Sequence, residues 1–205
     1  MLRNGFLAFA TTVACAGFSS AQTLPWPDVA AASNVTTPTS FSHVLARGAA
    51  CADFNGDGMV DLVVPDEPGS SFDVYLNLGG WFFIDISPVA GFGPTVQAKG
   101  FAPADYDNDG DQDLFICVKG GPCRLLQNNG MMMFVDVANA AGVDFVDDAF
   151  HATWGDYDGD GRLDLYVGVR RIPGAPASNR LFRNVGDGTF EDVTVAAGVA
   201  HDSLT

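Results

Sequence analysis

The sequence predicts an all-β protein made of β-propeller blades, with about three four-stranded repeats of about 51 residues that form a partial propeller. An Asp-rich loop followed by an apolar run occurs three times, and its first aspartates, Asp53, Asp105 and Asp156, are 52 and 51 residues apart. A second motif, Phe followed two residues later by Asp, alternates with these loops. Four short strands fit into each period, as in a propeller blade. A stacked β-solenoid has shorter units, and a sandwich does not repeat its sequence.

The composition suits a β-rich domain with a sizeable core. The 205 residues include 24 Gly and 11 Pro, and each of these costs roughly 1 to 3 kcal/mol inside a helix. Hydrophobic residues make up 47% of the chain, which argues against disorder. The formal net charge of −15 repels phosphate backbones and anionic lipid headgroups. No nucleic-acid partner is therefore expected, and cations are the natural counterpart.

The N-terminus, residues 1–21, predicts a secretory signal peptide. Arg3 supplies the positive region, residues 5–16 the apolar segment, and residues 19–21 a small-residue cleavage site. The apolar segment is shorter than the roughly 20 residues that span a bilayer, so no membrane insertion is expected. Residues 12–15 resemble a bacterial lipoprotein box, but Thr12 stands where Leu is typical, so lipid anchoring is not expected. The mature domain, residues 22–205, is predicted to be secreted, extracellular or periplasmic.

Three cysteines remain once the signal is removed. Cys117 and Cys123 flank the turn sequence Val-Lys-Gly-Gly-Pro, so they either form a disulfide across a hairpin in an oxidising compartment or stay separate thiols. Cys51 is expected to pack as a small hydrophobe. Glycosylation at Asn34, in the sequence Asn-Val-Thr, depends on the source organism.

The elements of each repeat follow one another in a fixed order. A strand enters the Asp-rich loop, and an apolar run leaves it (62–64, 114–116 and 165–167). After a Gly/Pro turn comes a second run, such as 74–76 or 180–182. An Asn-x-Gly turn (77–79, 128–130 and 184–186) then leads to the Phe-x-Asp strand (83–86, 134–137 and 190–193). A weaker copy of that last strand opens the mature chain at residues 26–29.

The loops at residues 53–61, 105–113 and 156–164 are candidate metal sites. Positions 1, 3, 5 and 9 carry Asp or Asn side chains, position 7 offers its backbone carbonyl, and a Gly at position 6 permits a tight bend. The candidate ligands are Asp53, Asn55, Asp57, Met59 and Asp61 in the first loop, Asp105, Asp107, Asp109, Asp111 and Asp113 in the second, and Asp156, Asp158, Asp160, Arg162 and Asp164 in the third, with Met59, Asp111 and Arg162 lending only their carbonyls.

Calcium is the metal that this donor set favours. Ca²⁺ takes six to eight hard oxygen ligands, Mg²⁺ keeps its waters, and softer metals need His or Cys, which the loops lack. About three Ca²⁺ ions are therefore predicted. Position 12 is Val64, Ile116 or Val167 rather than a bidentate Glu, which excludes an EF-hand. The alternative is that the loops are acidic surface turns without a metal, although crowded carboxylates repel one another in the absence of a cation.

These motifs resemble the FG-GAP/VCBS repeats of integrin α-subunit propellers and of many secreted bacterial proteins. The nearest likeness is to repeats that precede ASPIC/UnbV domains, on the sequences at residues 154–161 and 184–193. The resemblance covers residues 26–199 and implies a calcium-stabilised seven-bladed propeller, with the metal loop between the first two strands of a blade. The FG-GAP signature itself is degenerate, since residues 91–94 only approximate it, and residues 1–205 show no ASPIC/UnbV-like segment.

Three metal loops are fewer than the four blades that a closed propeller needs. We therefore expect either an N-terminal fragment of a longer propeller, whose missing blades complete the ring, or a short chain that self-associates.

The predicted function is a calcium-binding module for adhesion or for recognition of a protein or glycan ligand. A calcium-dependent structural or oligomerising module shares the same motifs. The alternative is the propeller portion of a polysaccharide lyase or hydrolase. His43, His151 and His201 occupy unrelated repeat positions, so no catalytic residue and no organic cofactor site is predicted. The three tryptophans, Trp26, Trp81 and Trp154, lie within repeat motifs and are expected to pack in the core.

Overall fold

A computed structural model of the chain describes residues 48–65, 72–92, 96–170 and 179–200. The predicted signal peptide, the weak repeat at residues 26–29, Asn34, His43 and His201 lie outside the described residues. The described part of the chain contains no helix with the length and apolar character needed to cross a membrane.

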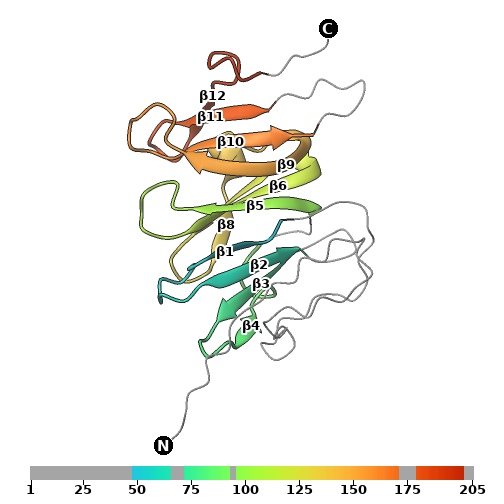
Figure 1. The fold of residues 1–205 in the computed structure, drawn as a ribbon, viewed down its shortest axis with the longest axis vertical. Coiled ribbons are helices and arrows are strands. Elements are labelled where there is room, and N and C mark those ends of the chain that lie inside the picture. The colour runs from blue at the N-terminus through green and yellow to red at the C-terminus, as the bar shows by residue number, and fades with distance from the viewer. Residues whose placement is uncertain (1–47, 66–71, 93–95, 171–178, 201–205) are drawn as a thin grey trace, which may run out of the picture.

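The described strands form three antiparallel four-stranded units, each with its strands in chain order (Figure 1). We call these units blades 1, 2 and 3. Blade 1 comprises β1 (Ala50–Ala52), β2 (Asp61–Pro65), β3 (Phe72–Asn77) and β4 (Phe83–Asp85); blade 2 comprises β5 (Ala98–Ala104), β6 (Asp113–Pro122), β7 (Arg124–Asn128) and β8 (Phe134–Asp136); blade 3 comprises β9 (Val146–Gly155), β10 (Asp164–Val169), β11 (Arg180–Asn184) and β12 (Phe190–Asp192). A four-residue helix, α1 (Ala138–Ala141), follows blade 2. The predicted all-β fold and the four strands per repeat are confirmed.

Blades 2 and 3 are also joined edge to edge. The long strands β6 and β9 continue past their own blades and pair with each other, with Lys119 opposite Asp148 and Pro122 opposite Val146. The two blades therefore share one continuous sheet at the end away from the Asp-rich loops.

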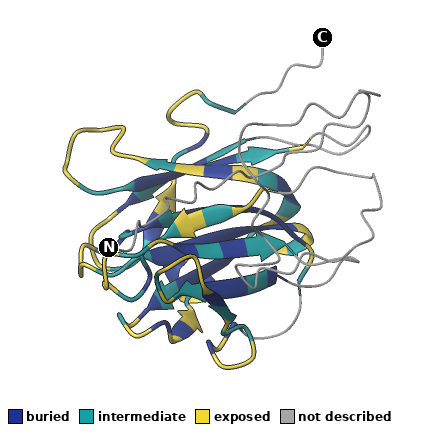
Figure 2. Cartoon of the chain, turned by 60° about the horizontal axis from the view of Figure 1, so that its bottom comes forward, coloured by how far each residue is buried: buried dark blue, intermediate teal, exposed yellow. Residues whose placement is uncertain are grey.

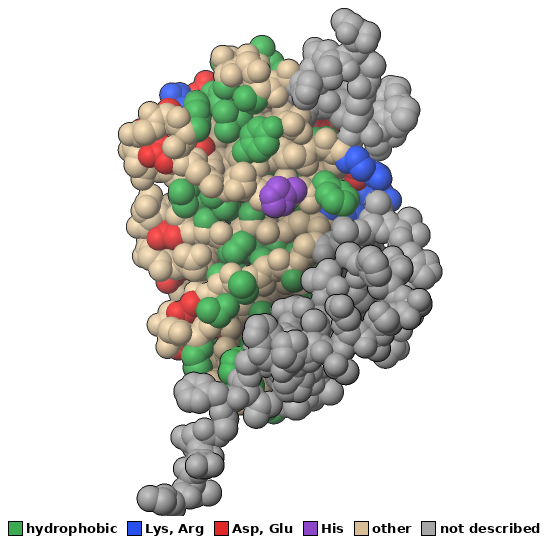
Figure 3. All heavy atoms as spheres, in the orientation of Figure 1, with side chains coloured by type: hydrophobic (Ala, Val, Ile, Leu, Met, Phe, Trp, Pro, Cys, Tyr) green, Lys and Arg blue, Asp and Glu red, His purple; other side chains and the backbone are tan. Residues whose placement is uncertain are grey.

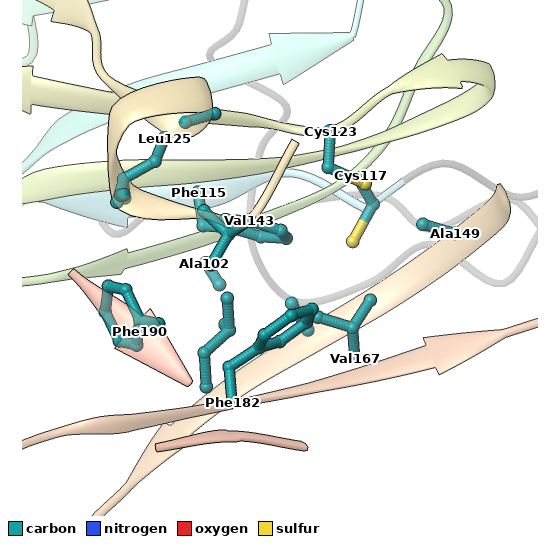
Figure 4. Packing of buried hydrophobic residues seen from close by; sticks show 14 of the residues in the cluster. Ala102, Phe115, Cys117, Cys123, Leu125, Val143, Ala149, Val167, Phe182 and Phe190 are labelled. Carbon is teal, nitrogen blue, oxygen red and sulfur yellow. The ribbon is translucent and has the colours of Figure 1, made fainter. Parts of the chain in front are cut away.

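The blades stack face to face and bury one apolar core at each interface. Because side chains alternate along a strand, Leu114 and Ile116 of β6 enter the core shared with blade 1, whereas Phe115 and Cys117 enter the core shared with blade 3 (Figure 4). The middle strands are accordingly buried on both sides, and exposure is concentrated in the connecting loops (Figure 2). Gly100 of β5 lies so close to β9 that an added Cβ would approach the Phe150 carbonyl oxygen to 2.7 Å.

The cysteine predictions need correction in one case. Cys117 and Cys123 are both buried in the core between blades 2 and 3 as free thiols. Of the two alternatives, the structure therefore shows separate thiols and not a disulfide. Cys51 is exposed and does not pack as predicted. Its neighbours Ala50 and Ala52 pack against the core between blades 1 and 2, so alternation along β1 turns Cys51 away from it.

The tryptophan prediction holds for one described residue and fails for the other. Trp154 packs against the core between blades 2 and 3, and its indole N–H donates to the Ala102 carbonyl over 3.0 Å. Trp81 is exposed, and it lies in the turn before β4 with a left-handed φ of 70°, outside the strands that face a blade interface.

Two equivalent asparagines link each blade to the one before it. The side-chain amide of Asn128 in blade 2 donates to the Phe54 carbonyl of blade 1 over 2.7 Å. In blade 3, the amide of Asn184 donates to the Tyr106 carbonyl of blade 2 over 2.8 Å. Each also donates to a carbonyl within its own blade. These amides thus satisfy backbone acceptors on both sides of a blade interface.

Replacing either interblade asparagine should destabilise the protein more than replacing its counterpart in blade 1. Asn128→Ala and Asn184→Ala leave buried carbonyl groups without a hydrogen-bond donor. Each unsatisfied group lowers the free energy of unfolding by roughly 1 to 3 kcal/mol. Asn77 is the matched control, because among the described residues its amide donates to the exposed Val60 carbonyl of its own blade and to no other blade. Urea unfolding of the three variants measures the difference. Equal losses in all three would contradict the interblade role.

Candidate metal centres

The three Asp-rich loops lie along one edge of the molecule. Each connects the first and second strands of its blade, and the blades stack in the same orientation. The acidic side chains consequently gather at three levels along that edge (Figure 3). This is the loop placement that the family resemblance implies.

The backbone of each loop wraps around the aspartate at position 1. In the second loop, the Asp105 carboxylate accepts hydrogen bonds from the N–H groups of Asp109 and Gly110, both over 3.1 Å. The first and third loops repeat this pair of bonds at Asp53 and Asp156. The position-6 glycines, Gly58, Gly110 and Gly161, have φ values of 82°, 97° and 85°, a left-handed conformation that favours Gly.

Carboxylate oxygens converge in the second and third loops. Asp105, Asp107 and Asp109 each offer an oxygen that lies within 4.8 Å of the others, and Asp156, Asp158 and Asp160 repeat this arrangement. Three hard oxygen donors at this separation fit a Ca²⁺ ion. In the first loop, Asn55 replaces the middle carboxylate, and its amide donates to Asp57 over 2.9 Å. That loop therefore gathers two carboxylates and one amide oxygen.

The position-9 aspartates are buried and act as anchors between backbone segments. Asp113 accepts from the N–H of Tyr106 over 3.3 Å and from the N–H of Asn128 over 2.8 Å. Asp61 and Asp164 make the same two bonds in their own blades. The loop spacing identifies all three only as metal ligands. The structure gives them a second role, which is to tie the start of the loop to the end of the third strand.

Two side chains to which the sequence pattern gives no role in the sites also reach the carboxylates. The Gln127 amide donates to Asp107 over 2.7 Å. The Arg162 guanidinium pairs with Asp160 and donates to the Asn184 carbonyl over 3.0 Å. Arg162 was predicted to contribute only its carbonyl, and a cation at position 7 was the signal available for this pairing. In the absence of metal, Arg162 offsets part of the charge of the third loop.

Burial raises the pKa of two of the anchoring carboxylates, Asp113 and Asp61. Desolvation by burial, together with the nearby Asp107 and Asp109 charges, raises the pKa of Asp113 to about 7, although the N–H groups of Asn128 and Tyr106 oppose the shift. Burial also raises the pKa of Asp61. By contrast, the N–H of Gly161 lowers the pKa of the exposed Asp156. The second loop thus combines a converging group of carboxylates with a buried carboxylate, Asp113, whose ionisation is disfavoured unless a positive charge is near.

Comparison with known proteins places these repeats in a family. The model of the FG-GAP-like repeat matches residues 53–116 and again 105–167, which together cover more than half of the chain and contain all three loops. The chain belongs to the FG-GAP-like repeat family. The two matched ranges overlap at the second loop, so each spans one full repeat and the beginning of the next.

Two relatives and one solved structure are also similar to the chain. Cartilage acidic protein 1 of Xenopus tropicalis is 28% identical over 141 residues, which are 67% of this chain and 21% of that protein. Human cartilage acidic protein 1 is 27% identical over 174 residues, or 81% of this chain and 25% of that protein. The FG-GAP-like chain thus spans about a quarter or less of these relatives. A structure of an Agrocybe aegerita lectin that recognises non-reducing terminal N-acetylglucosamine is similar with a TM-score of 0.46 and 24% identity, over 71% of this chain and 37% of that chain.

Without bound metal, the free energy of unfolding should rise as the pH falls from about 7 to 5. The folded-state pKa of Asp113, about 7, lies above its ordinary value of 3.8, so the folded chain binds the proton more tightly than the unfolded chain. The stabilisation is complete below the ordinary pKa and is lost as the pH rises through the folded one. Urea unfolding in a chelator between pH 5 and 8 measures this.

An Asp113→Asn variant should be less stable at pH 5, because its NH₂ group faces a backbone donor, and should show a flatter pH dependence. Asp111→Asn, in the same loop, is the control that should keep the slope. Stability of the metal-free wild type that increased from pH 5 to pH 8 would contradict this assignment.

Proposed function

We propose that the chain is a secreted calcium-binding β-propeller module that serves adhesion or the recognition of a protein or glycan, rather than an enzyme. In this proposal, Ca²⁺ has a structural role. The observation that carries it is the convergence of Asp105, Asp107 and Asp109, repeated in the equivalent residues of the third loop. Mutual repulsion among three carboxylates opposes folding. A bound divalent cation attracts all three, so the net electrostatic energy of the loop becomes favourable.

A structural role for the ion follows from what the loops connect. The aspartates at positions 1 and 9 hold the two ends of the loop, and position 9 also holds the third strand through its second oxygen. A Ca²⁺ ion bound by positions 1, 3 and 5 would therefore stiffen the junction between the first two strands of a blade. The position-7 carbonyls of Met59, Asp111 and Arg162 and the position-9 carboxylates complete the donor set expected from the sequence.

Calcium should raise the melting temperature, and one ligand substitution should reduce the effect. A site occupied at a free Ca²⁺ concentration of 100 times Kd adds about 2.7 kcal/mol, which corresponds to about 5 to 10 °C for a chain of this size. Asp109→Asn removes one of the converging carboxylates, so calorimetric titration with Ca²⁺ should show about one fewer high-affinity calcium site than in the wild type. Thermal melts in millimolar Ca²⁺ and in EDTA should show a correspondingly smaller shift.

The matched control for this experiment is Asp111→Asn. It lies two residues away and removes the same charge, but its side chain is not a predicted ligand and does not belong to the converging group. It should keep the full calcium response. A wild-type melt that is indifferent to calcium, or equal losses in both variants, would refute the metal assignment.

A recognition function calls for a stable scaffold that presents loops, and stacked blades provide one. We expect the purified chain to retain ligands from arrays of glycans and extracellular proteins in Ca²⁺, and to lose them in EDTA. His151, on β9, is exposed, and His151→Ala should leave binding unchanged. Depolymerisation of an acidic polysaccharide by the wild-type chain would instead favour the enzyme alternative.

A further inference from the structure

The three Asp-rich loops differ in the side chain at position 7, whose backbone carbonyl is the predicted ligand. Position 7 is Met59 in the first loop, Asp111 in the second and Arg162 in the third. Each of these side chains lies against the glycine of the Asn-x-Gly turn in its own blade. A Cβ added to that glycine would approach the position-7 side chain to 3.2 Å at Gly79, 2.7 Å at Gly130 and 3.2 Å at Gly186. The packing is therefore shared by the three loops, while the charge at position 7 is neutral, negative or positive.

In the third loop, Arg162 contacts both oxygens of the carboxylate at position 5. Its backbone N–H donates to Asp160 Oδ1 over 2.9 Å, and its guanidinium pairs with Asp160 Oδ2. The guanidinium Nε also donates to the Asn184 carbonyl over 3.0 Å, which holds the side chain in this position. Asp160 is one of the three converging carboxylates of this loop. Arg162 therefore neutralises a candidate metal ligand.

The equivalent carboxylate of the second loop has no such counter-charge. Asp109 Oδ1 accepts the N–H of Asp111 over 2.9 Å, and among the described residues no Lys or Arg forms an ion pair with Asp109. Five aspartates give residues 105–113 a formal charge of −5, whereas four aspartates and one arginine give residues 156–164 a formal charge of −3. The second loop therefore attracts a cation more strongly than the third.

We propose that Arg162 competes with calcium for Asp160, so that the third loop binds calcium more weakly than the second. This inference rests on the calcium binding proposed above. To serve as a metal ligand, Asp160 either shares its carboxylate with the guanidinium or releases it. Sharing brings two positive charges close together, and release gives up a charge-assisted hydrogen bond. Either course lowers the calcium affinity of the third loop, and the second loop fills at a lower calcium concentration.

Arg183, in the same blade, provides a matched control for the charge of Arg162. It pairs with Glu191, and the two side chains are 42% and 56% exposed. Arg183→Met removes one positive charge, as Arg162→Met does, but it releases Glu191 and none of the converging carboxylates. The two variants therefore separate direct competition at Asp160 from an effect of net charge.

The test is a calcium titration of the ¹⁵N-labelled full chain followed by NMR, in which one glycine N–H reports on each loop. Gly58, Gly110 and Gly161 each donate to the position-1 carboxylate of their own loop. Their amide signals should therefore shift when that carboxylate binds metal. In the wild type, the calcium concentration at half-saturation should be at least about fivefold higher for the Gly161 signal than for the Gly110 signal.

Arg162→Met, which introduces the position-7 residue of the first loop, should lower the half-saturating calcium concentration at Gly161 by at least about fivefold and leave that at Gly110 unchanged. Arg183→Met should change both by less than about twofold.

The reciprocal substitution keeps the proposal testable if Arg162→Met folds poorly without its hydrogen bond to Asn184. Asp111→Arg introduces a cation at position 7 of the second loop. It should raise the half-saturating calcium concentration at Gly110 by at least about fivefold and leave that at Gly161 unchanged.

The outcomes separate this proposal from the calcium function on which it rests. If calcium shifts the glycine signals but the second and third loops fill together, or if Arg162→Met leaves the Gly161 titration unchanged, the competition is overturned and calcium binding stands. An equal effect of Arg183→Met would assign the difference to net charge and also overturn the competition. Glycine signals that do not respond to calcium in any loop would overturn both.

Discussion

Each blade of this protein is organised around one buried carboxylate. Asp113 joins the loop that precedes β6 to the end of β7 by accepting two backbone N–H groups. An isolated buried charge is costly, and two N–H donors compensate for only part of that cost, as the raised pKa of Asp113 shows. Asp113, on which the fold of its blade depends, is therefore stabilised either by a bound proton or by a nearby cation.

The buried carboxylates are connected to one another through the blade interfaces. The N–H of Asn128 donates to Asp113, while its side chain donates to the Phe54 carbonyl of blade 1. The N–H of Phe54 in turn donates to Asp61. The same steps lead from Asp113 through Tyr106 and Asn184 to Asp164. One series of hydrogen bonds thus runs through all three blades and joins each loop to the next interface.

The sequence predicted most of the fold because the repeat is strong. Glycines, asparagines and Phe-x-Asp strands recur at fixed positions, so the strand order and loop positions followed directly from the spacing. It could not separate the two roles of the position-9 aspartates, because composition and spacing identify an oxygen donor without showing which N–H groups it accepts. Whether Cys51 and Trp81 are buried depends on which side of a three-residue strand and of a turn they occupy. Segments this short have no hydrophobic periodicity from which the buried side can be predicted.

The position-9 residue also explains why the loops and the blade interfaces belong to one system. Only a carboxylate offers two equivalent acceptors for two N–H groups, since an asparagine at the same place would turn an NH₂ group toward one of them. That requirement puts a negative charge beneath each loop, where it adds to the charges at positions 1 and 5. The hydrogen bonds that fix the strands therefore require a carboxylate, and its negative charge favours a bound cation. Each of the three stacked blades repeats this arrangement.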